Sequence, residues 1–183
     1  MTILLTQSVR SINFINRTKG YIMVINIKKT DSNATIPTRG SDRAAGFDLY
    51  SNETSVRIPV GETRLIGTGV CMEIPDGYAG LVYARSGLAS KRGLRPANCV
   101  GVIDPDYRGE IKVALHNDSQ ECQTIHIGDR LAQIVITPFL AVDFNEVDEL
   151  NETDRGEGGF GSTGVNKEPT PEYEQLSLFD ASM

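Results

Sequence analysis

The sequence predicts an all-β fold with one short helix. Its 183 residues suit one principal domain, and 39% of them are hydrophobic, which is enough to build a core. The 18 glycines and 8 prolines, with no tryptophan, favour many turns over long helices. From Ile111 to Leu115 every second residue is a large apolar one, a period of two that is typical of a half-buried strand. Many short strands predict a sandwich or a barrel.

Turn-forming residues separate the expected strands. The turn signals are Val60-Gly61, Pro75-Asp76-Gly77 and Ile127-Gly128-Asp129. The first strand is expected to begin at Met23 and to end at Lys29. Further strands are expected at 46 to 50, 56 to 60, 63 to 66, 68 to 74, 78 to 83, 123 to 127 and 131 to 140. Residues 86 to 92 form the one expected helix, with Ser86 as its N-cap and Gly93 after its end.

Charge and cysteine content exclude several classes of protein. The formal net charge is −6, whereas a sequence-independent grip on nucleic-acid phosphates needs a cationic face, so no direct nucleic-acid partner is expected. No apolar run approaches ~20 residues, so no membrane-spanning helix is expected. Three cysteines, at 71, 99 and 122, form no C-x-x-C pair, which indicates neither a disulfide framework nor a zinc site. Reduced thiols favour a cytoplasmic location.

The two ends of the chain differ from its middle. Residues 1 to 22 are interpreted as a leader that is disordered or not translated, because Met23 can be the real start. A transit peptide is the alternative, since residues 1 to 30 contain no acidic residue and carry Arg10, Arg17, Lys19, Lys28 and Lys29. Residues 23 to 149 are expected to form the β domain and 150 to 164 a glycine-rich lid. Residues 165 to 183, acidic and proline-containing, are expected to form a flexible tail.

The glycine-rich segment from Arg155 to Gly164 matches G-x-G-x-x-G at its centre. No βαβ unit follows and no Lys follows Gly161, so neither a dinucleotide fold nor a Walker A loop is predicted. Its backbone N–H groups, two hydroxyls and Arg155 can close on an anion, and Phe160 is its large apolar group. These parts suit a lid over an aromatic phosphorylated ligand, and a flexible linker is the alternative.

Two other segments carry candidate binding groups. Arg85-Ser86-Gly87 lies where the expected helix begins, so it is either a phosphate cradle or an ordinary helix cap. Asp104-Pro105-Asp106 lies between apolar stretches and predicts a hairpin with Tyr107 near its tip, for which a plain turn is the alternative.

Single polar residues inside apolar strands are further candidates. Asp48 needs a partner, because a buried acid is costly without one. Gln133 is either a satisfied core amide or an oriented catalytic amide. His116 and His126 have no partner at metal-ligand spacing and are interpreted as structural or surface residues.

Five segments, in order, resemble the five motifs of the homotrimeric dUTPases, the deoxyuridine 5'-triphosphate nucleotidohydrolases. They are AGFDLYS, ARSGLASKRG, NCVGVIDPDYRGEI, GDRLAQIVI and RGEGGFGSTG. The resemblance covers residues 23 to 164, and its one small departure is Ala84, where the family commonly has proline. It implies a distorted jelly-roll-like β-barrel, three chains around an axis, and composite active sites between subunits. It also implies Mg²⁺-dependent hydrolysis of dUTP to dUMP and pyrophosphate, which keeps uracil out of DNA and supplies dUMP for dTMP synthesis.

The resemblance also implies individual roles. Asp104 orients and activates the water that attacks the α-phosphorus, with Gln133 and Arg155 as the other catalytic residues. Tyr107 packs on the deoxyribose and excludes a 2′-hydroxyl. No side chain binds Mg²⁺ directly, since the substrate phosphates hold the ion and Asp48 supports its water shell. The implied uracil contacts are Asn98, Gly101, Val102 and Ile103. The implied phosphate contacts are Arg85, Ser86, Gly87 and Gln133, and the implied contacts from another chain are Arg155, Phe160, Gly161, Ser162 and Thr163.

The tail ends in a peptide with a separate resemblance. Gln175-Leu176-Ser177-Leu178-Phe179 resembles the Q-L-x-L-F peptide by which bacterial replication proteins dock on the DNA polymerase sliding clamp. A flexible tether would present Leu176, Leu178 and Phe179 to an apolar pocket while Gln175 fixes their orientation. Folding back on its own trimer is the alternative. Docking would make the source bacterial or a bacterial virus and would disfavour a transit peptide.

Two rival functions are distinguished by their products. A dCTP deaminase, a relative that shares the fold, would release ammonia, and GVIDPDY with the complete glycine-rich segment argues against it. A regulatory protein that uses a nucleotide-dependent lid as a switch would need a partner surface. Pyrophosphate release from dUTP separates the predicted enzyme from both.

Overall fold

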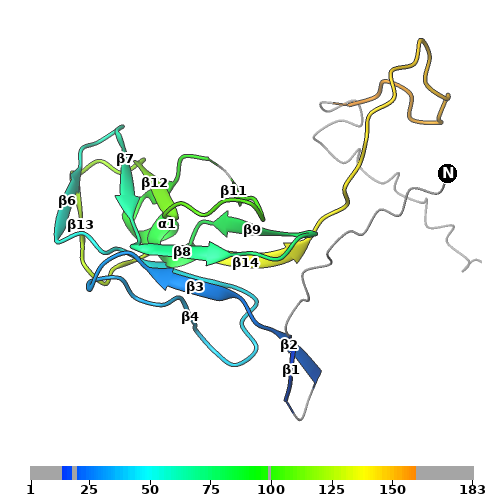
Figure 1. Ribbon diagram of the computed structural model, residues 1–183. Helices are drawn as coiled ribbons and strands as arrows, with labels where there is room; N and C mark the ends of the chain where they lie inside the picture. The colour runs from blue at the N-terminus through cyan, green and yellow to red at the C-terminus, as the bar shows by residue number, and fades with distance from the viewer. Residues whose placement is uncertain (1–13, 18–19, 99, 160–183) are drawn as a thin grey trace, which may run out of the picture. The chain divides into compact units, whose positions relative to one another are not determined.

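The computed structural model describes residues 14 to 17, 20 to 98 and 100 to 159 (Figure 1). It divides into two compact units, Met1–Val142 and Asp143–Met183. All of the described strands and the one described helix belong to the first unit. The leader, the lid and the tail expected from the sequence stay predictions.

Short strands dominate the described residues, so the predicted all-β class with one short helix is confirmed. The helix α1 is Ser86–Arg92, and among the described residues no helix is long and apolar enough to cross a membrane. The strands are β1 (Phe14–Arg17), β2 (Gly20–Met23), β3 (Asn26–Lys29), β4 (Thr38–Arg39), β5 (Phe47–Tyr50), β6 (Ser55–Ile58), β7 (Thr63–Gly67), β8 (Val70–Glu73), β9 (Tyr78–Tyr83), β10 (Leu94–Pro96), β11 (Gly101–Ile103), β12 (Lys112–Asn117), β13 (Gln123–His126) and β14 (Arg130–Pro138).

Antiparallel pairing joins these strands into small sheets. The largest sheet has the order β11-β9-β14-β5-β4, and a second has the order β10-β12-β7. The remaining pairs are β1 with β2, β3 with β8 and β6 with β13. Figure 1 shows β9 beside β14. Ile134 of β14 pairs with Val82 of β9.

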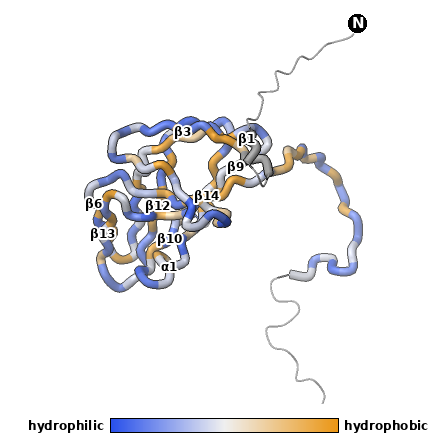
Figure 2. Tube along the Cα trace, turned by 90° about the horizontal axis from the view of Figure 1, so that it is seen from below, coloured by the Kyte–Doolittle hydropathy of each residue, from blue (hydrophilic) through white to orange (hydrophobic). Residues whose placement is uncertain are grey.

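One buried cluster fills the first unit. Leu49, Val82 and Ile134 of the largest sheet join Val113 and Leu115 of the second sheet in this core. Figure 2 shows hydrophobic stretches along β9 and β14 and hydrophilic ones along many of the turns. Burial of such side chains contributes roughly 1.5 to 3 kcal/mol each and is the main force that holds the two sheets together.

The helix has the predicted bounds, but its N-cap is Arg85 and not Ser86. Arg85 has extended backbone angles, φ −91° and ψ 125°, and its carbonyl accepts the N–H groups of Leu88 and Ala89, both at 3.0 Å. Its side chain makes no capping hydrogen bond, so the N-cap contributes only backbone geometry. Gly93 ends the helix with φ 62°, a left-handed angle that glycine adopts without steric cost.

The predicted hairpin around Asp104-Pro105-Asp106 is wrong. The strand before this turn, β11, pairs with β9, whereas the strand after it, β12, pairs with β7 and β10. The segment therefore crosses from one sheet to the other. Both flanks are apolar because each packs on the shared core, and a local apolar pattern does not reveal which strand is its partner.

The first predicted strand is divided differently in the structure. Met23 ends β2, which pairs with β1 as a hairpin, and β3 begins at Asn26. The short strands β4 and β10 carry no periodic signal, because two or three residues are too few to show an alternation.

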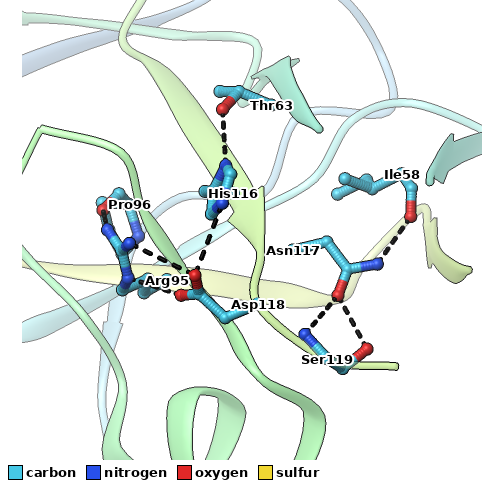
Figure 3. A network of polar contacts seen from close by, with 8 residues as sticks. All are labelled: Ile58, Thr63, Arg95, Pro96, His116, Asn117, Asp118 and Ser119. Atoms are coloured by element: carbon cyan, nitrogen blue, oxygen red, sulfur yellow. Dashed lines mark hydrogen bonds and ion pairs between the residues drawn. The ribbon is translucent and has the colours of Figure 1, made fainter. Parts of the chain in front are cut away.

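A network of polar contacts fastens the end of β12 to its surroundings (Figure 3). The Asn117 side chain is fully buried, and its Nδ2 donates to the carbonyl of Ile58 at 2.8 Å. The same nitrogen donates to the carbonyl of Glu121, also at 2.8 Å. Its Oδ1 accepts the N–H and the hydroxyl of Ser119, at 2.9 and 2.7 Å. All the hydrogen-bonding groups of this amide are thus engaged within one turn and one neighbouring strand.

His116 takes part in the same region as a structural residue. Its Nδ1 lies 2.9 Å from the Thr63 hydroxyl, and its Nε2 lies 3.4 Å from a carboxylate oxygen of Asp118 (Figure 3). Arg95 donates to both oxygens of that carboxylate, which ties β10 to the turn that follows β12. These contacts support the interpretation of His116 as structural.

We predict that Asn117→Ala lowers the free energy of unfolding by about 2 to 4 kcal/mol, because it leaves buried carbonyl and N–H groups without partners. Urea unfolding of the full chain measures the change. The exposed neighbour Gln120 provides the control, and Gln120→Ala should stay within about 0.5 kcal/mol of the parent. Equal stability of the two variants would contradict the role given to the amide.

Candidate active site

Asp48 lies at the centre of a cationic cluster on the largest sheet. It is the outward-facing residue of β5 between Phe47 and the fully buried Leu49. Its Oδ1 accepts Arg85 Nε at 2.7 Å, and its Oδ2 lies 3.3 Å from Arg130 Nη1. The Asp48 side chain is 12% exposed and that of Arg85 28%, so this pair is largely shielded from water. Asp48 thus has the partner that the sequence requires, and it holds two arginines in place.

Gln133 lies beside this cluster and links it to the helix. It is opposite Asp48 in the pairing of β14 with β5 and opposite Tyr83 in the pairing with β9. Its Nε2 donates to the carbonyl of Ala84 at 3.0 Å, which fixes the backbone just before Arg85. The half-buried side chain is therefore an oriented amide at the start of the helix.

Ser86 and Gly87 add neutral hydrogen-bond donors beside the cluster of Asp48, Arg85 and Arg130. Both are exposed in the first turn of α1, directly after Arg85. The first N–H groups of a helix have no partner within the helix, so they can donate to an anion. Arginines, a hydroxyl and these N–H groups form a surface that suits phosphate oxygens.

A second group of candidate residues surrounds β11. Asn98 is exposed, and its side chain lies against Gly101, where an added methyl group would be 3.0 Å from Nδ2. The buried Gly101 pairs with Val82, while the next residue, Val102, is exposed. Polar backbone groups and a nearby amide can bind the edge of a base.

Asp104 and Tyr107 follow β11 in the segment that crosses to the second sheet. The Tyr107 N–H donates to the Asp104 carbonyl at 3.2 Å, which closes a turn. Asp104 is exposed, so its carboxylate can reach a bound water. The Tyr107 hydroxyl donates to the Glu110 carbonyl at 2.9 Å, and the ring remains 44% exposed.

Strand β9 separates Asp104 from Arg85 within one chain. Arg85 follows the end of β9 at Tyr83, whereas Asp104 follows Ile103, which pairs with Gly80 near the start. At about 3.3 Å per residue, Gly80 and Tyr83 are already about 10 Å apart along the strand. Asn98, in contrast, precedes the residue that pairs with Val82 and so lies toward the Arg85 end. The structure therefore places the phosphate-binding candidate Arg85 and the catalytic candidate Asp104 toward opposite ends of one strand.

Arg155 belongs to the second unit and forms a turn of its own. Its Nε donates to the Gly158 carbonyl at 2.6 Å, and the Gly158 N–H donates back to the Arg155 carbonyl at 3.0 Å. Several sequence-based candidates lie outside the described residues. They are Phe160, Gly161, Ser162 and Thr163, and the tail peptide from Gln175 to Phe179. Cys99 also lies outside them.

Arg130 is a member of the cationic cluster that sequence reasoning missed. It lies opposite Tyr50, and the register of β14 against β5 shifts between Arg130 and Ala132. This irregularity accompanies the contact of Arg130 with Asp48, although the two are 82 positions apart in the chain. The usable signal was the acid in β5 without a local basic neighbour, but its partner becomes visible only when the strand pairing is known.

Comparisons with known proteins point to one family. The dUTPase family model matches residues 32 to 164. A deoxyuridine 5'-triphosphate nucleotidohydrolase from Nautilia profundicola is 51% identical over 142 residues, which are 78% of this chain and 99% of that protein. One from Helicobacter hepaticus is 49% identical over 143 residues, 78% of this chain and 90% of that protein.

Solved structures show the same similarity in three dimensions. A mutant dUTPase of Staphylococcus bacteriophage 80alpha with dUpNHpp has a TM-score of 0.70 and 31% identity, over 78% of this chain and 99% of that one. A mutant dUTPase from phage phi11 of S. aureus, described with a structural Mg(II) ion, has a TM-score of 0.65 and 28% identity, over 70% and 99%. The expected jelly-roll-like β fold of the dUTPases is confirmed. The chain belongs to the dUTPase family.

Proposed function

We propose that this chain hydrolyses dUTP to dUMP and pyrophosphate at a site built from its two residue clusters. Family membership gives the enzyme class, dUTP diphosphatase. The observation that carries the proposal is the chemistry of the clusters. One presents Arg85 and Arg130 around Asp48, which suits a triphosphate, and the other presents Asn98 and Tyr107, which suits a deoxynucleoside.

Asp104 is the residue that orients the attacking water. Its exposed carboxylate can accept a proton or a hydrogen bond from a water placed in line with the α-phosphorus. A carboxylate is a weak base, so most of the rate comes from positioning and from neutralising the phosphate oxygens. Gln133 assists as a second polar group at the phosphates. Arg155 assists as a cation from another chain.

Arg85 is prepared for phosphate binding by its own ion pair. Asp48 accepts from Nε, and in the described part of the chain no contact is shown for the two terminal nitrogens of Arg85. A guanidinium held on one side presents the other side to a phosphate with little further loss of side-chain entropy. Ser86, Gly87 and the segment from Arg155 to Thr163 provide further phosphate contacts in this proposal, and Phe160 stacks on uracil.

Mg²⁺ fits this site as a metal carried by the substrate. Within the described ranges no group of three or more His, Cys, Asp and Glu side chains could hold a metal ion. Both oxygens of Asp48 already face arginines, so this carboxylate is suited to support the water shell of an ion rather than to bind it directly. Bound through the phosphates, Mg²⁺ would supply charge neutralisation on their oxygens.

A homotrimer with sites shared between chains is part of the proposal. The separation of Arg85 from Asp104 by β9 supports a site that draws these two residues from different copies. Exposed apolar residues after β14 support association, because an isolated chain would leave them in water. They are Phe139, Leu140, Val142, Phe144, Val147 and Leu150, of which Phe144 is 97% exposed.

Two further expectations stay predictions. The cytoplasmic location depends on the cysteine pattern alone. Docking of Gln175, Leu176, Leu178 and Phe179 on a bacterial sliding clamp depends on a short peptide in the sequence. Three tails on a trimer would strengthen weak docking through effective concentration.

We predict that Asp104→Asn retains nucleotide binding but lowers kcat by at least about a hundredfold, since it removes the group that orients the water. Pyrophosphate release from dUTP measures turnover, and titration with a dUTP analogue carrying an α,β-imido bridge measures binding. Asp106→Asn, an exposed acid two residues away, is the matched control and should keep full activity. Full activity of the Asp104 variant would refute the proposed role.

For the tail, we predict that the intact chain captures a bacterial sliding clamp in a pull-down, whereas Leu178→Ala/Phe179→Ala does not. The apolar side chains are the part that enters a pocket, so their truncation removes the buried area. Ser177→Ala, at the variable position of the peptide, should bind as well as the parent. Equal capture by all three proteins, or by none, would rule out this mode of docking.

A further inference from the structure

The Tyr107 side chain lies directly on the backbone of Gly109. A methyl group added at Gly109 would be 2.5 Å from the tyrosine Oη, 2.6 Å from Cζ and 3.0 Å from Cε2. Real carbon atoms do not approach so closely, so any residue larger than glycine would have to displace the ring. A side chain at position 109 would therefore shift the Tyr107 ring from this position.

Neighbouring hydrogen bonds fix the backbone on which the Tyr107 ring lies. The Tyr107 hydroxyl donates to the carbonyl of Glu110, and a carboxylate oxygen of Glu110 accepts the N–H of Gly69 at 2.8 Å. The Ile111 N–H donates to the Val70 carbonyl at 2.9 Å, and Ile111 itself is buried. The backbone beneath the ring is therefore fastened to the bend between β7 and β8.

One part of the ring is covered and the rest is open. Gly109 and Glu110 cover the hydroxyl end, while 44% of Tyr107 is exposed. A sugar that packs on the exposed part of the ring contacts a surface whose position is set by the backbone under the ring. A displacement of the ring by the size of one methyl group would change the space beside C2′, where ribose and deoxyribose differ.

We propose that Gly109 is a specificity-determining residue, which sets the position of Tyr107 and thereby the discrimination of dUTP from UTP. The inference rests on the proposed function, in which Tyr107 packs on the deoxyribose. Gly109 touches no substrate atom in this account. Because Gly109 has no side chain, the Tyr107 ring can pack against the backbone. The Tyr107 hydroxyl then donates to the Glu110 carbonyl, which fixes the ring there.

Gly109→Ala tests the proposal, because the added carbon meets the outer end of a side chain that can rotate. We expect the ratio of kcat/KM for dUTP to that for UTP to fall by about tenfold, within the roughly hundredfold that a pocket gains by excluding one hydroxyl. The change should arise mainly in KM, with kcat for dUTP within a few-fold of the parent. Gly40→Ala is the matched control, since a methyl group there meets nothing within 4 Å.

A double-mutant cycle distinguishes a specific coupling between Gly109 and Tyr107 from a nonspecific loss of stability. In a Tyr107→Ala background there is no ring to displace, so adding Gly109→Ala should leave both the selectivity ratio and the urea midpoint unchanged. Additive losses in the double variant would overturn the proposal, as would an unchanged dUTP/UTP ratio in Gly109→Ala alone. If Gly109→Ala by itself does not fold, recovery of folding in the double variant supports the proposed contact between the Tyr107 ring and Gly109. Failure to recover contradicts this contact.

The experiment also keeps the two proposals apart. A parent chain that releases no pyrophosphate from dUTP would overturn the proposed function. The unfolding cycle needs no substrate, so it still decides whether Gly109 and Tyr107 are coupled. A parent chain that is active on dUTP, with Tyr107 and Gly109 uncoupled, would overturn the inference alone.

Discussion

Strand β9 is hydrogen-bonded to β11 along one edge and to β14 along the other, and the candidate site depends on this double pairing. Because a paired strand cannot shorten or slide without breaking its ladder, the residues near its two ends stay a fixed distance apart. Arg85 follows one end, and Asp104 lies toward the other. In the proposed function, the sheet supplies a phosphate-binding end and a water-orienting end, and a second copy of the chain brings the two ends together.

The ion pairs around Asp48 matter more for position than for stability. A charge pair that is partly shielded from water loses hydration free energy, and this loss offsets much of the attraction between the charges. What remains is geometry, since Asp48 holds Arg85 and Arg130 while Gln133 fixes the Ala84 backbone. A site arranged before the substrate arrives loses less entropy on binding, which is how a rigid sheet assists a reaction that depends on alignment.

Local patterns in the sequence predicted local structure well. The residues of β9 and α1 have their predicted bounds, because the Pro75-Asp76-Gly77 turn before β9 and Gly93 after α1 are visible in one short window. Pairing between distant strands was not visible, so the turn after β11 was misread as a hairpin and Arg130 was missed. The site candidates came from the chemistry of a few segments and from their resemblance to five motifs. The contact of Tyr107 with Gly109 was not predictable, because adjacency in sequence does not show where a ring lies.

Subunit complementation tests most directly whether one site is shared between chains. Arg85→Gln, which keeps a hydrogen-bond donor near Asp48, and Asp104→Asn each disable one half of the site. Purified separately, both should release little pyrophosphate from dUTP. After the two are mixed, unfolded and refolded together, sites that join the intact Arg85 of one chain to the intact Asp104 of another should restore a substantial part of the activity. A refolded mixture as inactive as the two separate variants would contradict the shared site.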